Sequence, residues 1–222
     1  MPVKQFIISK KRRVLVSENS PHYGVCKTLH LIDASISKKK KEKLVLRKVS
    51  VTETILENFL LSPHLETIVI HHARYLKHVH IGGRNLKLKH FEIVATTTVS
   101  SIVLSDFDLE SFTYKGSKTE LDLAHLSMLR EIDMYDGHIR LNSNMFKQIA
   151  SCALSLQHLS IYIVDPTKSL NLHSLPVLPN VKKLRLAIGS SKYNCLEYLG
   201  AILSACPNLE NFTRLMQLYL FT

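Results

Sequence analysis

A short apolar pattern recurs along this chain and restricts its possible folds more than any other feature. It consists of an apolar residue, two variable positions, a second apolar residue, one variable position and a third apolar residue. Eight copies begin at Leu65, Leu76, Leu88, Val99, Leu109, Leu129, Leu156 and Val181, and a weaker one begins at Leu209. The second and third apolar positions alternate with polar ones, which is the periodicity of a strand with one buried side. Each copy therefore predicts one short strand.

The spacing of the copies indicates the kind of repeat. Without those at Leu76 and Val99, successive copies start 20 to 28 residues apart, within or close to the range of leucine-rich repeats. Leu76 and Val99 fall about halfway between their neighbours. We expect these two copies to be extended return segments on the opposite side of two coils.

Three stretches, 55–66, 145–152 and 199–210, resemble one another where a helix would end and lead into the next strand. In the first, apolar residues have helical spacing, and Thr52 precedes them as a candidate cap. One coil cannot bury its apolar side alone, so the coils must stack. The sequence therefore predicts an α/β leucine-rich-repeat solenoid, with a curved parallel sheet and with helices or extended segments on its convex side.

Positive charge is concentrated at the start of the chain. The net charge is +11, but residues 1–50 hold 13 Lys and Arg against 3 acidic residues, whereas residues 51–222 hold 16 against 15. The basic patch consists of Lys10, Lys11, Arg12, Arg13, Lys38, Lys39, Lys40 and Lys41. Such runs bind phosphates or act as nuclear import signals, but they are also common in solvated tails. We divide the chain into a basic tail, 1–24, and a repeat domain, 25–222.

The cysteines and the apolar runs indicate a compartment. Cys26, Cys152, Cys195 and Cys206 form no Cys-x-x-Cys pair, which argues against a zinc knuckle or a thioredoxin-like redox site. The chain shows no secretory signal and no run of about 18 apolar residues that could span a membrane. We therefore expect a cytoplasmic or nuclear protein with reduced thiols and no membrane partner.

Signatures of catalysis and of metal binding were not found in the sequence. It contains no phosphate-binding glycine loop, no His-Glu-x-x-His and no Gly-x-Ser-x-Gly. Five histidines are close in sequence, namely His64, His71, His72, His78 and His80. No nearby cysteine or paired carboxylate completes a ligand set with them. We expect no enzyme activity, no cofactor and no metal.

Four segments look like the repeats of a known family, namely 60–67, 86–93, 109–116 and 178–184. Through them the chain resembles plant F-box proteins with leucine-rich repeats, of the type often followed by an FBD domain, over about residues 44–213. This resemblance implies a substrate adaptor of cullin-based ubiquitin ligases, in which an F-box binds a Skp1-like subunit and the repeats present a target. The sequence departs from that pattern, because it has no recognisable F-box and no complete FBD.

Three functions are compatible with these features. The leading one is a protein-protein interaction module that recognises a substrate in the manner of the adaptors, with a protein target and, if an F-box equivalent exists, a Skp1-like subunit as partners. The second is binding of nucleic acid or a phosphorylated small molecule by the basic segment. Nucleic acid is the less favoured partner, because the basic runs carry no groups that read bases. The third is a shortened paralogue without function.

The variable positions between the buried ones predict the binding surface. In leucine-rich-repeat strands these residues point to the concave face, which is the usual binding surface of a solenoid. The expected partner-binding residues are His90, Glu92, Glu131, Asp133, His158, Lys183 and Arg185, together with Tyr135 and Tyr162 just beyond their strands. Their charge runs from acidic in the middle to basic near the last two, which favours a partner of complementary charge.

Overall fold

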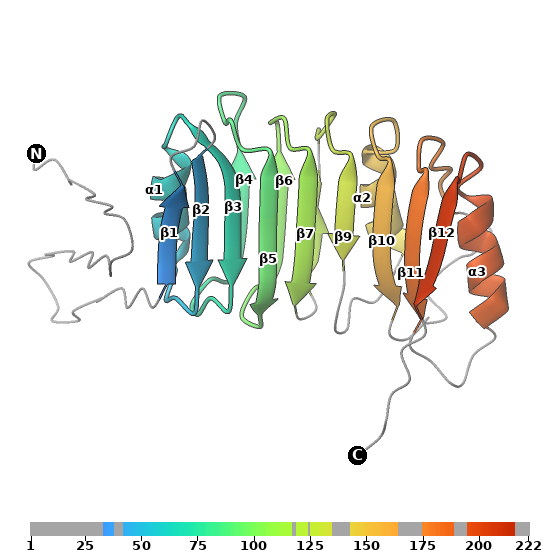
Figure 1. Cartoon of the computed structure of the whole chain (residues 1–222), viewed down its shortest axis with the longest axis horizontal. Coiled ribbons are helices and arrows are strands. Elements are labelled where there is room, and N and C mark those ends of the chain that lie inside the picture. The colour runs from blue at the N-terminus through green and yellow to red at the C-terminus, as the bar shows by residue number, and fades with distance from the viewer. Residues whose placement is uncertain are drawn as a thin grey trace, which may run out of the picture.

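A computed structural model of the chain describes residues 33–37, 42–116, 119–123, 125–134, 143–163, 175–188 and 195–215. Its main layer is a nine-stranded sheet in the order β1-β2-β3-β5-β7-β9-β10-β11-β12 (Figure 1). The strands are Asp33–Ser37 (β1), Glu42–Arg47 (β2), Leu65–His71 (β3), His90–Thr96 (β5), Ser111–Gly116 (β7), Glu131–Met134 (β9), His158–Ile163 (β10), Lys183–Ile188 (β11) and Asn211–Leu215 (β12).

All neighbouring strands from β2 to β12 pair in parallel. The three apolar residues of each repeat are called here its apolar triplet. The triplets of neighbouring strands stand in register, so that Phe91 lies opposite Ile68 on one side and Phe112 on the other. The rings of Phe91 and Phe112 stack with their centroids 6.2 Å apart. The predicted leucine-rich-repeat solenoid, with its triplets as rungs of one parallel ladder, is thereby confirmed.

The core lies on one side of this sheet. The first position of the repeat is buried at the turn that leads into each strand, as for Leu88 and Leu156. The second and third positions are buried below the sheet, as for Leu159 and Ile161. Large apolar side chains thus fill the solenoid from one coil to the next, which is how the coils share a single core.

Three short parallel strands form a second sheet behind the first, in the order β4-β6-β8 (Figure 1). They are His78–Gly82 (β4), Ser101–Ser105 (β6) and Glu120–Asp122 (β8). The first two are the return segments predicted from Leu76 and Val99. We did not predict β8, because the alternation of Leu121 and Leu123 has no apolar residue three positions before it.

Helices take the place of these return strands in three other coils of the described chain. They are Glu53–Leu60 (α1), Ser143–Ser151 (α2) and Cys195–Ser204 (α3). In Figure 1, α1 and α2 lie behind the nine-stranded sheet, and α3 lies beside its last strand, β12. All three fall where the sequence predicted them. Thr52 occupies the N-cap position of α1, but its side chain makes no capping hydrogen bond, so its predicted capping role is wrong.

The beginning of the sheet differs from the sequence prediction. Strand β2 continues the parallel ladder. The repeat pattern did not predict it, because Lys41 stands where the first apolar residue of the repeat would be. Strand β1 pairs with β2 in the antiparallel sense. The repeat pattern does not predict β1, because an antiparallel partner at the end of a solenoid need not follow the repeat.

Candidate functional site

The face of the nine-stranded sheet that points away from the helices and the second sheet is called here the open face. Strand pairing places its side chains in rows that cross the strands. The first row consists of Lys43, Thr67, His90, Ser111, Glu131, His158, Lys183 and Asn211. The second row consists of Val45, Val69, Glu92, Thr113, Asp133, Ser160, Arg185 and Thr213. Residues from eight strands thus share one surface.

The structure brings most of the predicted binding residues onto this face. His90, Glu131, His158 and Lys183 stand in the first row, and Glu92, Asp133 and Arg185 stand in the second. Their role in binding remains a prediction. Tyr162 belongs to β10, where its backbone lies opposite Ala187. Tyr135 and the basic patch, Lys10 to Arg13 and Lys38 to Lys41, lie outside the described residues.

Two hollows lie on the open face. The first hollow encloses about 300 Å³, and its lining residues run from Ser111 on β7 to Thr213 on β12. The other hollow, also about 300 Å³, extends from Lys43 on β2 to Thr113 on β7. Both are lined by the two rows and by the strands beneath them. Together they extend across the sheet from β2 to β12.

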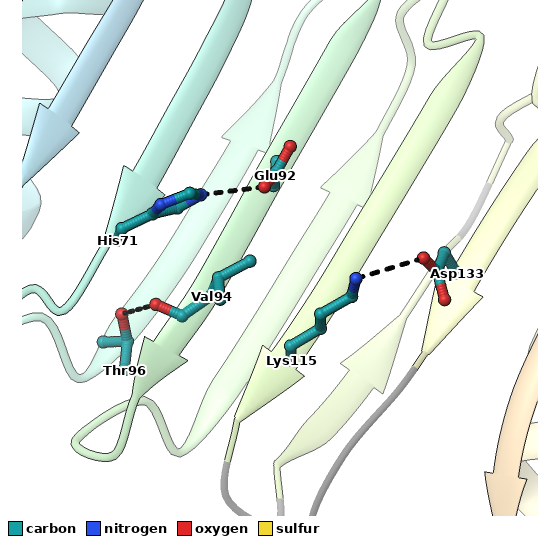
Figure 2. Close-up of polar contacts among 6 residues, drawn as sticks. All are labelled: His71, Glu92, Val94, Thr96, Lys115 and Asp133. Carbon is teal, nitrogen blue, oxygen red and sulfur yellow. Dashed lines mark hydrogen bonds and ion pairs between the residues drawn. The ribbon is translucent and has the colours of Figure 1, made fainter.

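Several acidic groups of the open face are already paired with a neighbouring strand. His158 Nδ1 lies 2.6 Å from Glu131 Oε1, directly across the β9–β10 pair. Figure 2 shows a pair of His71 Nε2 with Glu92 Oε1 at 2.8 Å and an ion pair of Lys115 Nζ with Asp133 Oδ2 at 3.4 Å. These bridges connect adjacent strands and fix the orientation of the carboxylates.

The basic side chains of β11 contrast with this pattern. Lys183 and Arg185 are both exposed, and within the described residues neither makes an ion pair. The open face therefore changes from acidic on β9 to basic on β11, as the sequence suggested. The two charged strands are separated by β10, which contributes His158 and Ser160.

Sequence reasoning missed two polar residues of the open face. His71 and Lys115 stand on the same side of β3 and β7 as the second row, two residues beyond Val69 and Thr113. Both form the bridges described above. The signal was available, because the strand alternation continues to the position after the triplet, which was included only at Tyr135 and Tyr162.

The histidines near β4 make contacts of other kinds. His78 Nδ1 lies 2.9 Å from Ser101 Oγ, and His71 contacts Glu92. Across the described parts of the chain, no group of three or more His, Cys, Asp and Glu residues is placed to hold a metal ion. In those same parts, no helix has the length and apolar character needed to cross a membrane.

Comparison with known families agrees with this architecture. The family model described as "At1g61320/AtMIF1, LRR domain" matches residues 25–218. The chain belongs to this leucine-rich-repeat family. No curated protein and no solved structure matches it.

As a leucine-rich-repeat domain, the chain falls in a class of solenoids that bind other proteins on the extended face of their sheet. It is therefore a protein-protein interaction module by class. The family match covers the repeats that the sequence resemblance rested on. It carries no information on an F-box or on a ubiquitin ligase.

Proposed function

We propose that this leucine-rich-repeat domain binds a protein target on its open face and selects that target as a substrate for a ubiquitin ligase. The observation that carries target binding is the pair of in-register rows, which place polar and charged side chains from eight strands on one surface with two hollows. The ligase role is supported by the resemblance of the repeat segments to F-box adaptors. The proposal assigns the chain no catalytic step and places it in the cytoplasm or nucleus.

Affinity purification of the full chain with matched variants tests target binding. Thr113→Arg combined with Ser160→Arg puts two large cations into the hollow over β7 to β12. His80→Arg combined with Asn85→Arg makes the same change in charge at exposed positions in and just after β4. We expect the open-face pair to lose the bound target and the control pair to keep it, with circular dichroism showing that both remain folded.

The ligase role has its own readout in the same purification. A Skp1-like subunit should accompany the wild-type chain and both variants, because its contact would not involve the open face. Loss of the target with retention of this subunit supports both parts of the proposal. Absence of the subunit rejects the ligase role and leaves target binding intact, and absence of any target from all baits rejects the proposed function.

The second candidate function, phosphate binding by the basic segment, is favoured by the concentration of charge in residues 1–50, which hold 13 of the 29 Lys and Arg residues. Binding to nucleic acid or an inositol phosphate through that segment should weaken steeply as salt rises, since counterion release drives it. Neutralising Lys38, Lys39, Lys40 and Lys41 should abolish it. Binding that ignores salt excludes this alternative.

A further inference from the structure

The hollow over β7 to β12 has a simple arrangement along the second row. Asp133 and Arg185 stand on β9 and β11, and the residue between them on β10 is Ser160. Thr113 and Thr213 continue the row on either side. Two opposite charges therefore stand in a line of otherwise small hydroxyl side chains, which leaves a furrow across the strands. All five residues line the hollow.

Both charges retain capacity for an external partner. The ion pair of Asp133 Oδ2 with Lys115 Nζ measures 3.4 Å, longer than the 2.7–2.9 Å typical of a charge-assisted hydrogen bond. Despite this ion pair, the side chain of Asp133 keeps 31% of its accessible surface. Arg185 and the nearby Lys183 are exposed, and among the described residues no carboxylate pairs with them. A ligand that supplies one cation and one anion would complete this arrangement.

The spacing of the two charged residues favours one conformation of such a ligand. Neighbouring strands lie about 4.8 Å apart, so the backbones of Asp133 and Arg185 are about 9.6 Å apart across β10. A polyproline II segment has three residues per turn and rises about 3.1 Å per residue, which places residues i and i+3 on one side about 9.3 Å apart. In a β-strand, residues on one side are about 6.7 Å or 13 Å apart.

The sheet under the furrow also limits the kind of occupant. The strands beneath use their backbone groups in the sheet, so they offer no ladder to an added strand. A polyproline II segment needs none, because its backbone is solvated.

We propose that this hollow binds a polyproline II segment of a partner protein that carries a basic and an acidic residue three positions apart. The basic residue contacts Asp133, and the acidic residue contacts Arg185 and Lys183. The segment can run in either direction across the furrow, so either order of the two charges fits. This inference rests on the proposed function, since it names the chemistry of the target that the open face would bind.

A selection from random dodecapeptides linked to their messenger RNA tests this inference with the full chain as bait. We expect the enriched peptides to pair a basic with an acidic residue at i and i+3, often with proline between or beside them. Lys183→Glu combined with Arg185→Glu should reduce recovery of these peptides about ten-fold, the combined effect of losing two exposed charge contacts. Arg84→Glu combined with Lys87→Glu, an equal change of charge in the exposed turn after β4, should leave recovery unchanged.

A second selection, on the variant with Lys183→Glu and Arg185→Glu, strengthens the test. It should enrich peptides with two basic residues at the same spacing, because the basic half of the hollow, formed by Lys183 and Arg185, has become a second anionic one. Three outcomes would overturn the inference. The first is enrichment of peptides with another charge spacing, the second is recovery that does not change with Lys183→Glu and Arg185→Glu, and the third is no enrichment at all. The proposed function would survive those outcomes if the affinity purification still showed a target that depends on the open face.

Discussion

At the scale of single residues, Gly116 is required at the end of β7. A Cβ atom at this position would lie 2.7 Å from Tyr114 Oη and 3.0 Å from the carbonyl oxygen of Thr96. Neither neighbour moves easily, since Tyr114 is buried and Thr96 belongs to the adjacent strand. The repeat pattern could not reveal this requirement, because Gly116 lies beyond the triplet.

Gly116→Ala should lower the free energy of unfolding by about 1–3 kcal/mol, the usual cost of an overpacked core position. Urea unfolding followed by circular dichroism measures the change. Gly200→Ala is the matched control, because nothing lies within 4 Å of the added Cβ, and removal of a glycine from a helix should add about 0.5–1 kcal/mol. A Gly116→Ala variant as stable as the wild type would show that Tyr114 does not occupy this place.

Burial of Tyr114 predicts instability in alkali. Burial raises the pKa of Tyr114 from 10.0 to about 12, so the unfolded chain loses this proton at lower pH than the folded one. The stability that this difference provides is complete below pH 10 and is lost as the pH rises toward 12. Between these values the wild type should lose stability more steeply than Tyr114→Phe, as measured by urea unfolding. Equal slopes would contradict the burial of the phenol.

At the scale of elements, a carboxylate joins α1 to β4. Glu53 Oε1 accepts hydrogen bonds from the backbone N–H groups of Lys77 at 2.9 Å and His78 at 3.0 Å. Burial, the largest single influence, raises the pKa of Glu53, but the backbone hydrogen bonds from His78, Glu53 itself and Lys77 together outweigh it and lower the pKa below its ordinary value. The helix and the return strand of successive coils are thereby tied together.

Glu53→Gln should therefore destabilise the protein in a pH-dependent way. Hydrogen bonds to charged groups contribute about 1.5–3 kcal/mol, and the substitution loses a part of this. Because the folded pKa is lowered, the advantage of the wild type is complete above the ordinary value of 4.5 and disappears as the pH falls through the lowered one. Urea unfolding at a series of pH values measures the difference. Glu57→Gln, which removes the charge of an exposed carboxylate in the same helix, is the matched control.

The residue that directly follows the first apolar position of each repeat belongs to a polar ladder that strengthens the register. Its residues are Glu66, Lys89, Glu110, Arg130, Gln157, Lys182 and Glu210, and each backbone N–H after the first bonds to the carbonyl oxygen of the one before. Lys89 Nζ lies 2.7 Å from Glu110 Oε1, and this hydrogen bond raises the pKa of Lys89 and lowers that of Glu110. The alternation of charge was visible in the sequence once the repeats were aligned.

Sequence reasoning succeeded for the elements that repeat and failed for those that do not. Parallel strands, both return segments and all three helices follow from periodic apolar residues, because each coil must solve the same packing problem. Strands β1 and β8 follow no full repeat, and β2 has Lys41 where an apolar residue was expected. On the open face, the rows followed from strand alternation. The bridges of His71 and Lys115 did not, since they join side chains diagonally across strands.

At the scale of the whole molecule, each coil contacts only its neighbours, so stability is distributed unevenly along the sheet. Interior strands such as β5 and β7 are paired on both sides, whereas β12 pairs with β11 alone among the described strands. Residues 211–214 of β12 are all exposed, and Phe212 retains 39% of its accessible surface.

Backbone amides of β12 should therefore exchange with solvent deuterium much faster than those of β5 and β7. Hydrogen exchange followed by mass spectrometry measures this for peptides from each strand. Uniform protection along the sheet would contradict the nearest-neighbour account, because it would require the last described strand to be as well packed as the middle ones.

The open face as the protein-binding surface is tested most directly by photocrosslinking. A benzophenone amino acid placed at Ser160 lies in the hollow over β7 to β12, whereas the same group at His80 lies exposed on the return strand β4. With the full chain in its native cell extract, we expect illumination to join a distinct protein target to the chain from position 160 and not from position 80. Crosslinking to that target from position 80 alone would contradict the account.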